Sequence, residues 1–311
     1  MAISGNFSFR FMALVFLLVV MKPGYCLAEK DTVSSSGSIN KKRLTGVLTG
    51  GTLVYATGMI ALYGSWYRNY EQSPFHFFDD SREWLQVDKT GHLTTSYYVG
   101  YLGYQSFRYT GMDEKRSALL GGLTSWLSMA TIEVFDGFSE QWGASVTDLC
   151  ANTLGSALFT SQQIVWHEQR ILVKWSYHPT KFPDYRPDLL GDNFAGKMLK
   201  DYNGHTYWLS VNLKSFLDKN SGFPAWLNFA FGYGAEGMTG AAVNSSVYNG
   251  KAIPHFERQR QYYFGPDIDL TRIRTRSKVL NALCKSVGFI RLPLPAVEFS
   301  KSGICFHPLY F

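Results

Sequence analysis

Helix-length stretches of mostly apolar residues dominate the first half of the chain. Residues 45–67 contain no charged side chain, and at 1.5 Å per residue a helix of this length crosses a bilayer core of about 30 Å. Its glycines would allow close contact with a neighbouring helix. We therefore expect a membrane helix here. Because Thr and Gly dilute its hydrophobicity, a buried helix of a soluble bundle is the alternative.

Three more helices follow, separated by turn-like sequences. They are less apolar than lipid-exposed spans usually are, so parts of them should face each other. Together the four helices predict a membrane-associated helical bundle over residues 45–170. The predicted helices cover residues 45–67, 88–108, 115–136 and 145–166. Residues 75–86, which are aromatic and acidic, suit an amphipathic segment at a membrane surface or an ordinary surface helix.

The character of the chain changes after residue 170. A proline-bearing connecting loop is expected over residues 171–204, and apolar and polar side chains then alternate with a period of two, which is typical of antiparallel strands. The predicted strands cover residues 206–213, 226–234 and 261–273, and a short amphipathic helix is predicted over residues 277–287. We expect a mostly α protein with a small antiparallel sheet in residues 205–311. The aromatic alternation resembles outer-membrane strands, although three or four segments are too few to close a barrel.

The N-terminus reads as an export signal over residues 1–28, followed by a linker over residues 29–44. Arg10 flanks an apolar run, and a small-residue ending predicts cleavage after Ala28; an uncleaved anchor helix is the alternative. Tyr25 is bulkier than lipid-attachment sites usually accept, so we do not expect a lipid on Cys26.

Composition points towards a membrane or its interface. Charged residues make up 17% of the chain, whereas ordinary soluble proteins have roughly a quarter. The net charge of +6 is too small to argue for nucleic acid. Cys150 is expected to be a small core residue, and export makes a disulfide between Cys284 and Cys305 feasible.

The helices at residues 88–166 carry ionisable residues at spacings of three or four, which place them on shared helix faces. The motifs are D-K-x-x-H at Asp88, Lys89 and His92, E-x-x-D at Glu133 and Asp136, and D-x-x-x-N-x-x-G at Asp148, Asn152 and Gly155. Such groups are costly in apolar surroundings unless they are paired, hydrated or bound to something. We therefore predict that these faces meet in one polar pocket.

The pocket could perform several kinds of chemistry. Asp88 could orient the His92 imidazole, and the carboxylates of Glu133, Asp136 and Asp148 could hold a divalent cation or position a water molecule near an ester or phosphate. Lys89, Ser145 and Asn152 would then contact the substrate. No cofactor or particular metal follows from these residues. The alternative is that they lock the helices in register through buried polar contacts, because no nucleophile motif or phosphate-binding loop accompanies them.

These motifs resemble two bacterial envelope families. The D-K-x-x-H, E-x-x-D and S-x-x-D pattern is similar to the uncharacterised YfiM-type lipoproteins, and D-K-x-x-H with a later Glu and D-x-x-x-N-x-x-G is similar to VanZ-like membrane proteins. The resemblance covers residues 88–160, and the rest looks like longer Bacteroidetes-type members. It implies an envelope protein without a secure reaction; VanZ-like proteins are associated with glycopeptide resistance.

We therefore expect a protein exported to the bacterial cell envelope, membrane-associated and facing the periplasm, with the outer membrane favoured over the inner. Its polar pocket would bind or act on a membrane lipid or envelope glycan headgroup, as a hydrolase or transferase if it is an enzyme. The alternative is a non-enzymatic assembly or scaffold protein that docks an envelope protein partner through its aromatic strands. Nucleic acid is not an expected partner.

Overall fold

The structure is a computed structural model that describes residues 38–68 and 71–311. The signal peptide, Cys26 and most of the expected linker lie outside the described residues. Contacts divide the chain into two units, which we call the helical unit and the sheet unit. The helical unit comprises Glu29–Ser81, as far as it is described, and Lys89–Gln169; the sheet unit includes Arg82–Asp88 and Arg170–Phe311.

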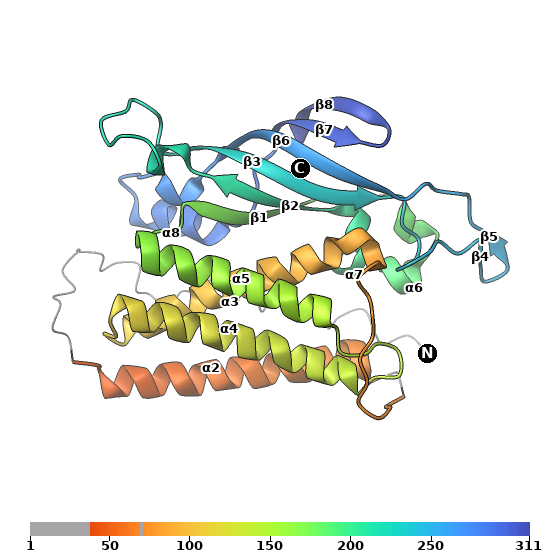
Figure 1. Cartoon of the computed structure of the whole chain (residues 1–311), viewed down its shortest axis with the longest axis horizontal. Coiled ribbons are helices and arrows are strands. Elements are labelled where there is room, and N and C mark those ends of the chain that lie inside the picture. Colours follow the sequence, from red (N-terminus) through yellow and green to blue (C-terminus); the bar gives the residue numbers. More distant parts are fainter. Residues whose placement is uncertain (1–37, 69–70) are drawn as a thin grey trace. The chain divides into compact units, whose positions relative to one another are not determined.

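The helical unit is built from α2 (Lys41–Leu62), α3 (Val87–Tyr109), α4 (Glu114–Gly137) and α5 (Val146–Trp166), the long helices of Figure 1. A π-helical turn at Tyr63–Tyr67 continues α2. The last three helices begin and end within two residues of the predicted positions. Helices α2 and α4 are long and apolar enough to cross a membrane. Among the described side chains of α2 only Ala61 is buried, so the alternative of a buried bundle helix does not describe it.

Small residues let α3, α4 and α5 approach one another closely. A Cβ atom on Gly121 of α4 would lie 2.7 Å from the carbonyl oxygen of Gly100 in α3. A Cβ on Gly155 of α5 would lie 2.1 Å from the carbonyl oxygen of Leu93 in α3. Both distances are shorter than any side chain tolerates. Backbone contact at these points therefore sets the spacing of the three helices.

The sheet unit contains one six-stranded antiparallel sheet with the strand order β1-β2-β3-β6-β7-β8 (Figure 1). Its strands are β1 (Ile171–Tyr177), β2 (His205–Val211), β3 (Leu227–Glu236), β6 (Gln259–Ile268), β7 (Leu294–Ser300) and β8 (Gly303–Tyr310). A separate hairpin pairs β4 (Val247–Tyr248) with β5 (Lys251–Ala252). Three helices complete the unit, α6 (Pro187–Leu190), α7 (Phe194–Lys200) and α8 (Lys278–Val287).

The connecting loop expected over residues 171–204 is wrong in part, because it contains β1, α6 and α7. The central residue of β1 is Lys174, a charge that argues against a buried strand. Its ammonium group lies 2.6 Å from Asp267 of β6, and both side chains are fully buried. A partner 93 residues away therefore makes this strand possible, and sequence alone does not reveal it.

Polar residues share the buried face of the sheet with aromatic and small apolar ones, whereas much of the exposed face is apolar. Thr206, Trp208 and Ser210 of β2 are buried, whereas Leu209 between them is exposed. The same alternation places exposed Phe231, Tyr262 and Phe299 on the neighbouring strands. One apolar core of this unit lies on the buried face of the sheet around Trp208, Tyr263 and Tyr310. A second lies around Trp84, Phe182, Leu190 and Met238.

The structure also decides several smaller points that the sequence raised. Residues 75–86 do not form the surface helix given as the alternative: Phe77 forms a β-bridge with Ala144, and helical structure begins only at Glu83. The Asp79 carboxylate accepts a hydrogen bond from the Ser81 amide, a local turn that competes with a helix. Cys150 is exposed rather than buried. Cys284 and Cys305 are both free thiols in this structure.

Candidate functional site

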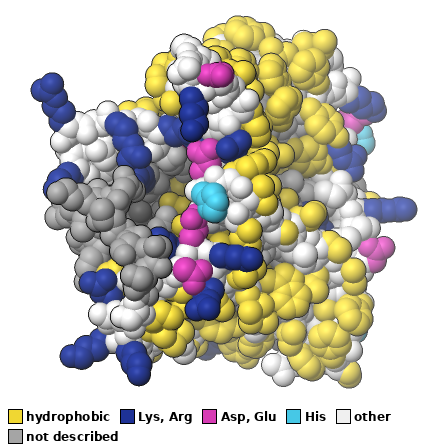
Figure 2. Space-filling view, turned by 60° about the vertical axis from the view of Figure 1, so that its left-hand side comes forward, with side chains coloured by type: hydrophobic (Ala, Val, Ile, Leu, Met, Phe, Trp, Pro, Cys, Tyr) yellow, Lys and Arg dark blue, Asp and Glu magenta, His cyan; other side chains and the backbone are white. Residues whose placement is uncertain are grey.

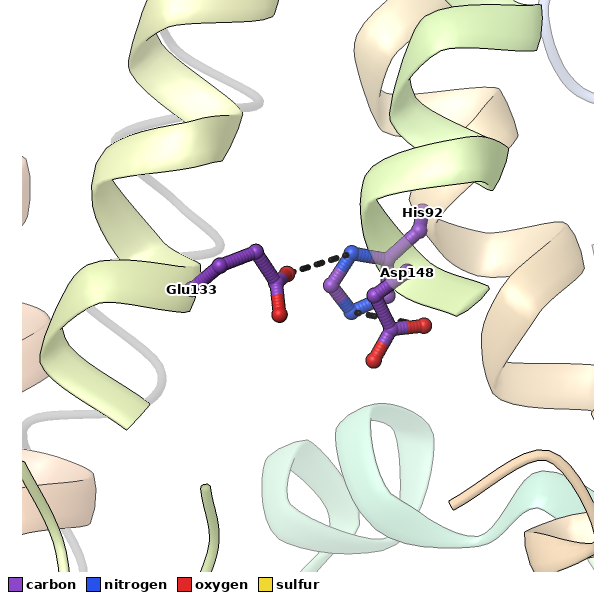
Figure 3. Close-up of side chains that lie close together, drawn as sticks. All are labelled: His92, Glu133 and Asp148. Atoms are coloured by element: carbon purple, nitrogen blue, oxygen red, sulfur yellow. Dashed lines mark ion pairs between the residues drawn. The ribbon is translucent and has the colours of Figure 1, made fainter. Parts of the chain in front are cut away.

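Three helices bring His92, Glu133 and Asp148 together. The imidazole of His92 lies between the two carboxylates, with one ring nitrogen turned towards each (Figure 3). His92 Nδ1 lies 3.6 Å from Glu133 Oε1, and Nε2 lies 3.9 Å from Asp148 Oδ1. Glu133 and Asp148 are buried, whereas the His92 side chain is 25% exposed. One edge of this group, which we call the helical cluster, is therefore open to solvent.

The start of α5 positions the Asp148 side of the cluster. Ser145 caps this helix, because its hydroxyl accepts a hydrogen bond of 3.0 Å from the Asp148 amide. The Ser145 amide in turn lies 3.3 Å from Glu133 Oε2 and donates to it. One turn further on, Asn152 places its Oδ1 3.2 Å from His92 Nδ1. The close approach of α5 to α3 at Gly155 makes these contacts possible.

Lys89 joins a second layer of the cluster. Its ammonium group lies 2.8 Å from Asp148 Oδ1 and also forms an ion pair with Asp80. The hydroxyls of Ser145 and Thr147 donate to the same Asp80 oxygen at 2.6 and 2.8 Å. Asp80 and Thr147 were not among the predicted site residues. The Asp79-Asp80 pair in the acidic segment was the only sequence signal for them.

Two further residues of the predicted pocket, Asp136 and Asp88, lie beside the cluster rather than in contact with His92. Asp136 faces Tyr67, whose hydroxyl donates a hydrogen bond of 2.6 Å to Asp136 Oδ1. Asp136 therefore lies at the margin of the cluster.

Asp88 lies one turn before His92 in α3, and its overall contacts group it with the sheet unit. One of its carboxylate oxygens nevertheless lies within 4.8 Å of carboxylate oxygens of Asp80 and Asp148. At His92 Nδ1 the structure places Asn152, where the sequence suggested Asp88.

The cluster and its neighbours contain more carboxylates than cationic side chains, and burial together with this excess shifts the carboxyl pKa values. Burial, followed by the charges of Asp148 and Asp136, raises the pKa of Glu133 to about 8. Burial also raises the pKa of Asp136 to about 6 and raises that of Asp148. Burial acts in the same direction on Asp80, but hydrogen bonds led by that from Lys89 lower its pKa to about 2.

Helix ends add to this imbalance. Glu133 and Asp136 lie in the last turns of α4, where the helix dipole disfavours negative charge. Asp148 lies in the first turn of α5, where the dipole favours it. The two carboxylates that face His92 therefore have opposite backbone environments. Glu133 is the one whose negative charge is least compensated by the protein.

Three buried polar atoms on the residues around His92 have no hydrogen-bond partner among the described residues, namely Glu133 Oε1, Asp148 Oδ1 and Asn152 Nδ2. Asp148 Oδ1 is ion-paired with Lys89, which leaves Glu133 Oε1 and Asn152 Nδ2, on side chains that are 2% and 0% exposed. Such atoms normally cost free energy, so a buried pair at one place points to a missing partner. One donor atom from each of His92, Glu133 and Asp148 lies within 4.8 Å of the others. This arrangement can hold a small cation.

Comparison with known proteins gives one match. A family model described as a predicted periplasmic lipoprotein (DUF2279) matches residues 76–162. The matched segment contains the whole helical cluster, His92, Glu133 and Asp148, together with Asp80 and Lys89. No curated protein and no solved structure matches the chain. The match supports similarity to uncharacterised envelope lipoproteins, and it is consistent with export and membrane association.

Proposed function

We propose that this is a bacterial cell-envelope protein whose helical cluster binds a divalent metal ion and, through it, the anionic headgroup of a membrane lipid or envelope glycan. The observation that carries the proposal is the buried Glu133 Oε1, which lacks a hydrogen-bond donor among the described residues and faces His92. A metal ion would supply the missing positive partner.

The donor set favours a transition-series ion such as Zn²⁺ or Mn²⁺. One imidazole nitrogen and two carboxylate oxygens suit such ions better than Mg²⁺ or Ca²⁺, which prefer oxygen alone. Zn²⁺ binds these donors at about 2.0–2.2 Å. The three donor atoms already lie within 4.8 Å of one another, so small side-chain rotations can bring them to one ion.

The charge of the cluster explains why an anionic headgroup would need the metal. Lys89 pairs with Asp80 and Asp148, and its charge also acts on Glu133 and Asp136, so one lysine serves four carboxylates. Ionised carboxylates repel a phosphate or carboxylate ligand, whereas a divalent ion reverses the local charge. The exposed edge of His92 is the side from which a headgroup would approach.

Metal titration tests the first part of the proposal. The full chain, stripped with a chelator, is titrated with Zn²⁺ and Mn²⁺ while thermal stability and bound metal are measured. His92→Gln, Glu133→Gln and Asp148→Asn should each weaken binding by about tenfold or more. His167→Gln is the matched control, because His167 lies 3.1 Å from Glu114 in the same unit but outside the cluster. Wild-type affinity in all three cluster variants would refute the site.

The second part is tested with short-chain phosphatidylglycerol and a soluble muropeptide as probes. Calorimetric binding of one probe should appear with metal-loaded protein and disappear after chelation or in Glu133→Gln. Binding that persists without metal contradicts the proposed role of the ion. No binding of either probe by metal-loaded protein refutes headgroup recognition while leaving the metal site standing.

A specific observation favours scaffolding as the second candidate. The outward face of the sheet exposes Phe231, Ile304 and Phe306, which are 56%, 75% and 62% accessible. In the space-filling view hydrophobic side chains gather into continuous patches rather than lying singly (Figure 2), and such patches mark interaction surfaces. If scaffolding is the function, a gene carrying both Phe231→Ser and Phe306→Ser should fail to complement a deletion strain. A gene carrying Glu133→Gln should still complement it.

A further inference from the structure

The α8 segment of the sheet unit, residues 270–287, combines positive charge with exposed apolar side chains. From residue 270 to residue 297 the sequence contains no Asp or Glu. Arg274, Arg276 and Lys278 are exposed and form no ion pair with the described acidic residues. Arg272, by contrast, is held by Asp269 at 3.2 Å. Three uncompensated cations therefore lie at the start of α8.

Helix α8 turns its apolar side outwards. Val279, Leu280 and Leu283 are 69%, 46% and 48% exposed, whereas Ser286 is buried. Residues spaced by three or four lie on one helix face, so these side chains form one exposed stripe. An ordinary surface helix buries its apolar stripe against the protein and exposes its polar side. Here the orientation is reversed.

Polar contacts hold the helix in this orientation. Asn281 accepts a hydrogen bond of 2.7 Å from the Thr275 amide, and its side-chain nitrogen donates to the Thr275 carbonyl oxygen at 2.9 Å. Ser277 caps the helix by accepting from the Leu280 amide at 3.3 Å. These bonds tie the polar side of α8 to the preceding turn, and they leave the leucines free to contact something else.

We propose that the α8 segment is a membrane-surface anchor that binds anionic lipid. Basic side chains beside an exposed apolar stripe match a bilayer surface, where cations meet lipid phosphates and apolar groups enter the acyl boundary. A nucleic acid or soluble acidic protein would satisfy the cations but would leave Val279, Leu280 and Leu283 in water. The surface is separate from the helical cluster and does not depend on its metal.

Vesicle flotation of the full chain tests the proposal. Binding is compared between vesicles of phosphatidylcholine and vesicles of phosphatidylcholine with phosphatidylglycerol in equal parts, and the ratio removes any contribution of other apolar helices. Changing Arg274, Arg276 and Lys278 to Gln should reduce the preference for anionic vesicles on the order of a hundredfold. Changing Lys115, Lys219 and Lys251 to Gln removes three exposed charges elsewhere and is the matched control. An unchanged preference in the α8 charge variant overturns the proposal.

A second variant separates lipid insertion from simple charge attraction. Leu280→Asn with Leu283→Asn keeps every cation, and since both side chains are exposed, thermal melting should be unchanged. This variant should lose binding to anionic vesicles by about tenfold or more. Wild-type binding in this variant, or equal capture of the wild type by a soluble polyanion such as heparin, identifies a non-lipid partner and overturns the proposal. Chelation should change none of these results.

Discussion

The two units of this protein bury charged side chains in opposite ways. In the sheet unit, Lys174 and Asp267 form a fully buried pair at 2.6 Å, and the Ser210 hydroxyl donates to Asp267 at 2.6 Å. Lys174 also donates to the Ile268 carbonyl oxygen at 2.7 Å. In the helical unit, several carboxylates crowd around Lys89 and His92, and Glu133 Oε1 has no donor among the described residues.

The difference distinguishes a structural ion pair from a candidate binding site. A buried pair with matched charges and hydrogen bonds holds two strands together and leaves little reason for a ligand. Burial, followed by the charges of Asp148 and Asp136, raises the pKa of Glu133, so its ionised form is unfavourable unless a cation binds. Asp267 Oδ1, like Glu133 Oε1, has no hydrogen-bond partner among the described residues. Neither a buried charge nor an unsatisfied oxygen therefore identifies a site by itself; an excess of buried carboxylate over positive charge does.

The largest effect is expected from breaking the matched pair. Lys174→Met leaves the Asp267 carboxylate buried without its cation and should lower the free energy of unfolding of the sheet unit by about 3–5 kcal/mol. Denaturant unfolding, followed by circular dichroism, measures the change. Lys174→Met combined with Asp267→Leu removes both charges and should recover much of the loss. If the free energy of unfolding of Lys174→Met alone lies within about 1 kcal/mol of the wild-type value, the ion pair does not hold β1 in place.

A smaller effect is expected where α5 meets α3. Gly155→Ala adds a Cβ that meets the Leu93 carbonyl oxygen at 2.1 Å, so the helices must separate. We expect a loss of about 1–3 kcal/mol in stability, together with weaker metal binding, because Asp148 and Asn152 move away from His92. Gly50→Ala is the control: a Cβ there meets nothing within 4 Å, and stability should be unchanged or slightly higher. If Gly155→Ala binds metal as tightly as the wild type, the close contact of α5 with α3 does not position the metal-binding residues.

The smallest effect concerns the pH dependence of the unmatched cluster. The pKa of Glu133 is about 4.5 unfolded and about 8 folded, so its contribution to stability is fully present below pH 4.5 and is lost as pH rises towards 8. Without metal, Glu133→Gln should remove this decline and be more stable than wild type at pH 8 by about 1–2 kcal/mol. Thermal melting at pH 6 and pH 8 with a chelator present measures it. If the melting temperatures of the two proteins change by the same amount between pH 6 and pH 8, Glu133 does not carry an uncompensated charge.

Metal should reverse the sign of that comparison. A divalent ion that binds Glu133→Gln at least tenfold more weakly stabilises the wild type more than the variant, so Zn²⁺ should offset the advantage of Glu133→Gln at pH 8 and make it the less stable protein. The same crossover is not expected for His167→Gln, whose ring pairs with Glu114 outside the cluster. The crossover therefore links the pH behaviour to the proposed site.

Local patterns by themselves determined the positions of the long helices and much of the candidate site. Apolar periodicity and caps such as Ser145 are local, so the ends of α3, α4 and α5 could be predicted within two residues. The i to i+4 spacing of Asp148 and Asn152 placed both on one face, and the structure sets that face against His92. The amphipathic helix at residues 277–287 could also be predicted, because the spacing of its apolar residues is a property of that segment alone.

Only the tertiary structure decided which charges meet and which apolar faces remain exposed. Lys174 needs Asp267, and Lys89 needs Asp80 from a loop that the sequence presented as a surface helix. The sequence of α8 defines an apolar stripe but not its direction, which depends on the contacts of Asn281 with Thr275. The physical reason is the same in each case: periodicity reports the face of an element, whereas the free energy of a buried charge or an exposed leucine depends on neighbours that only folding supplies.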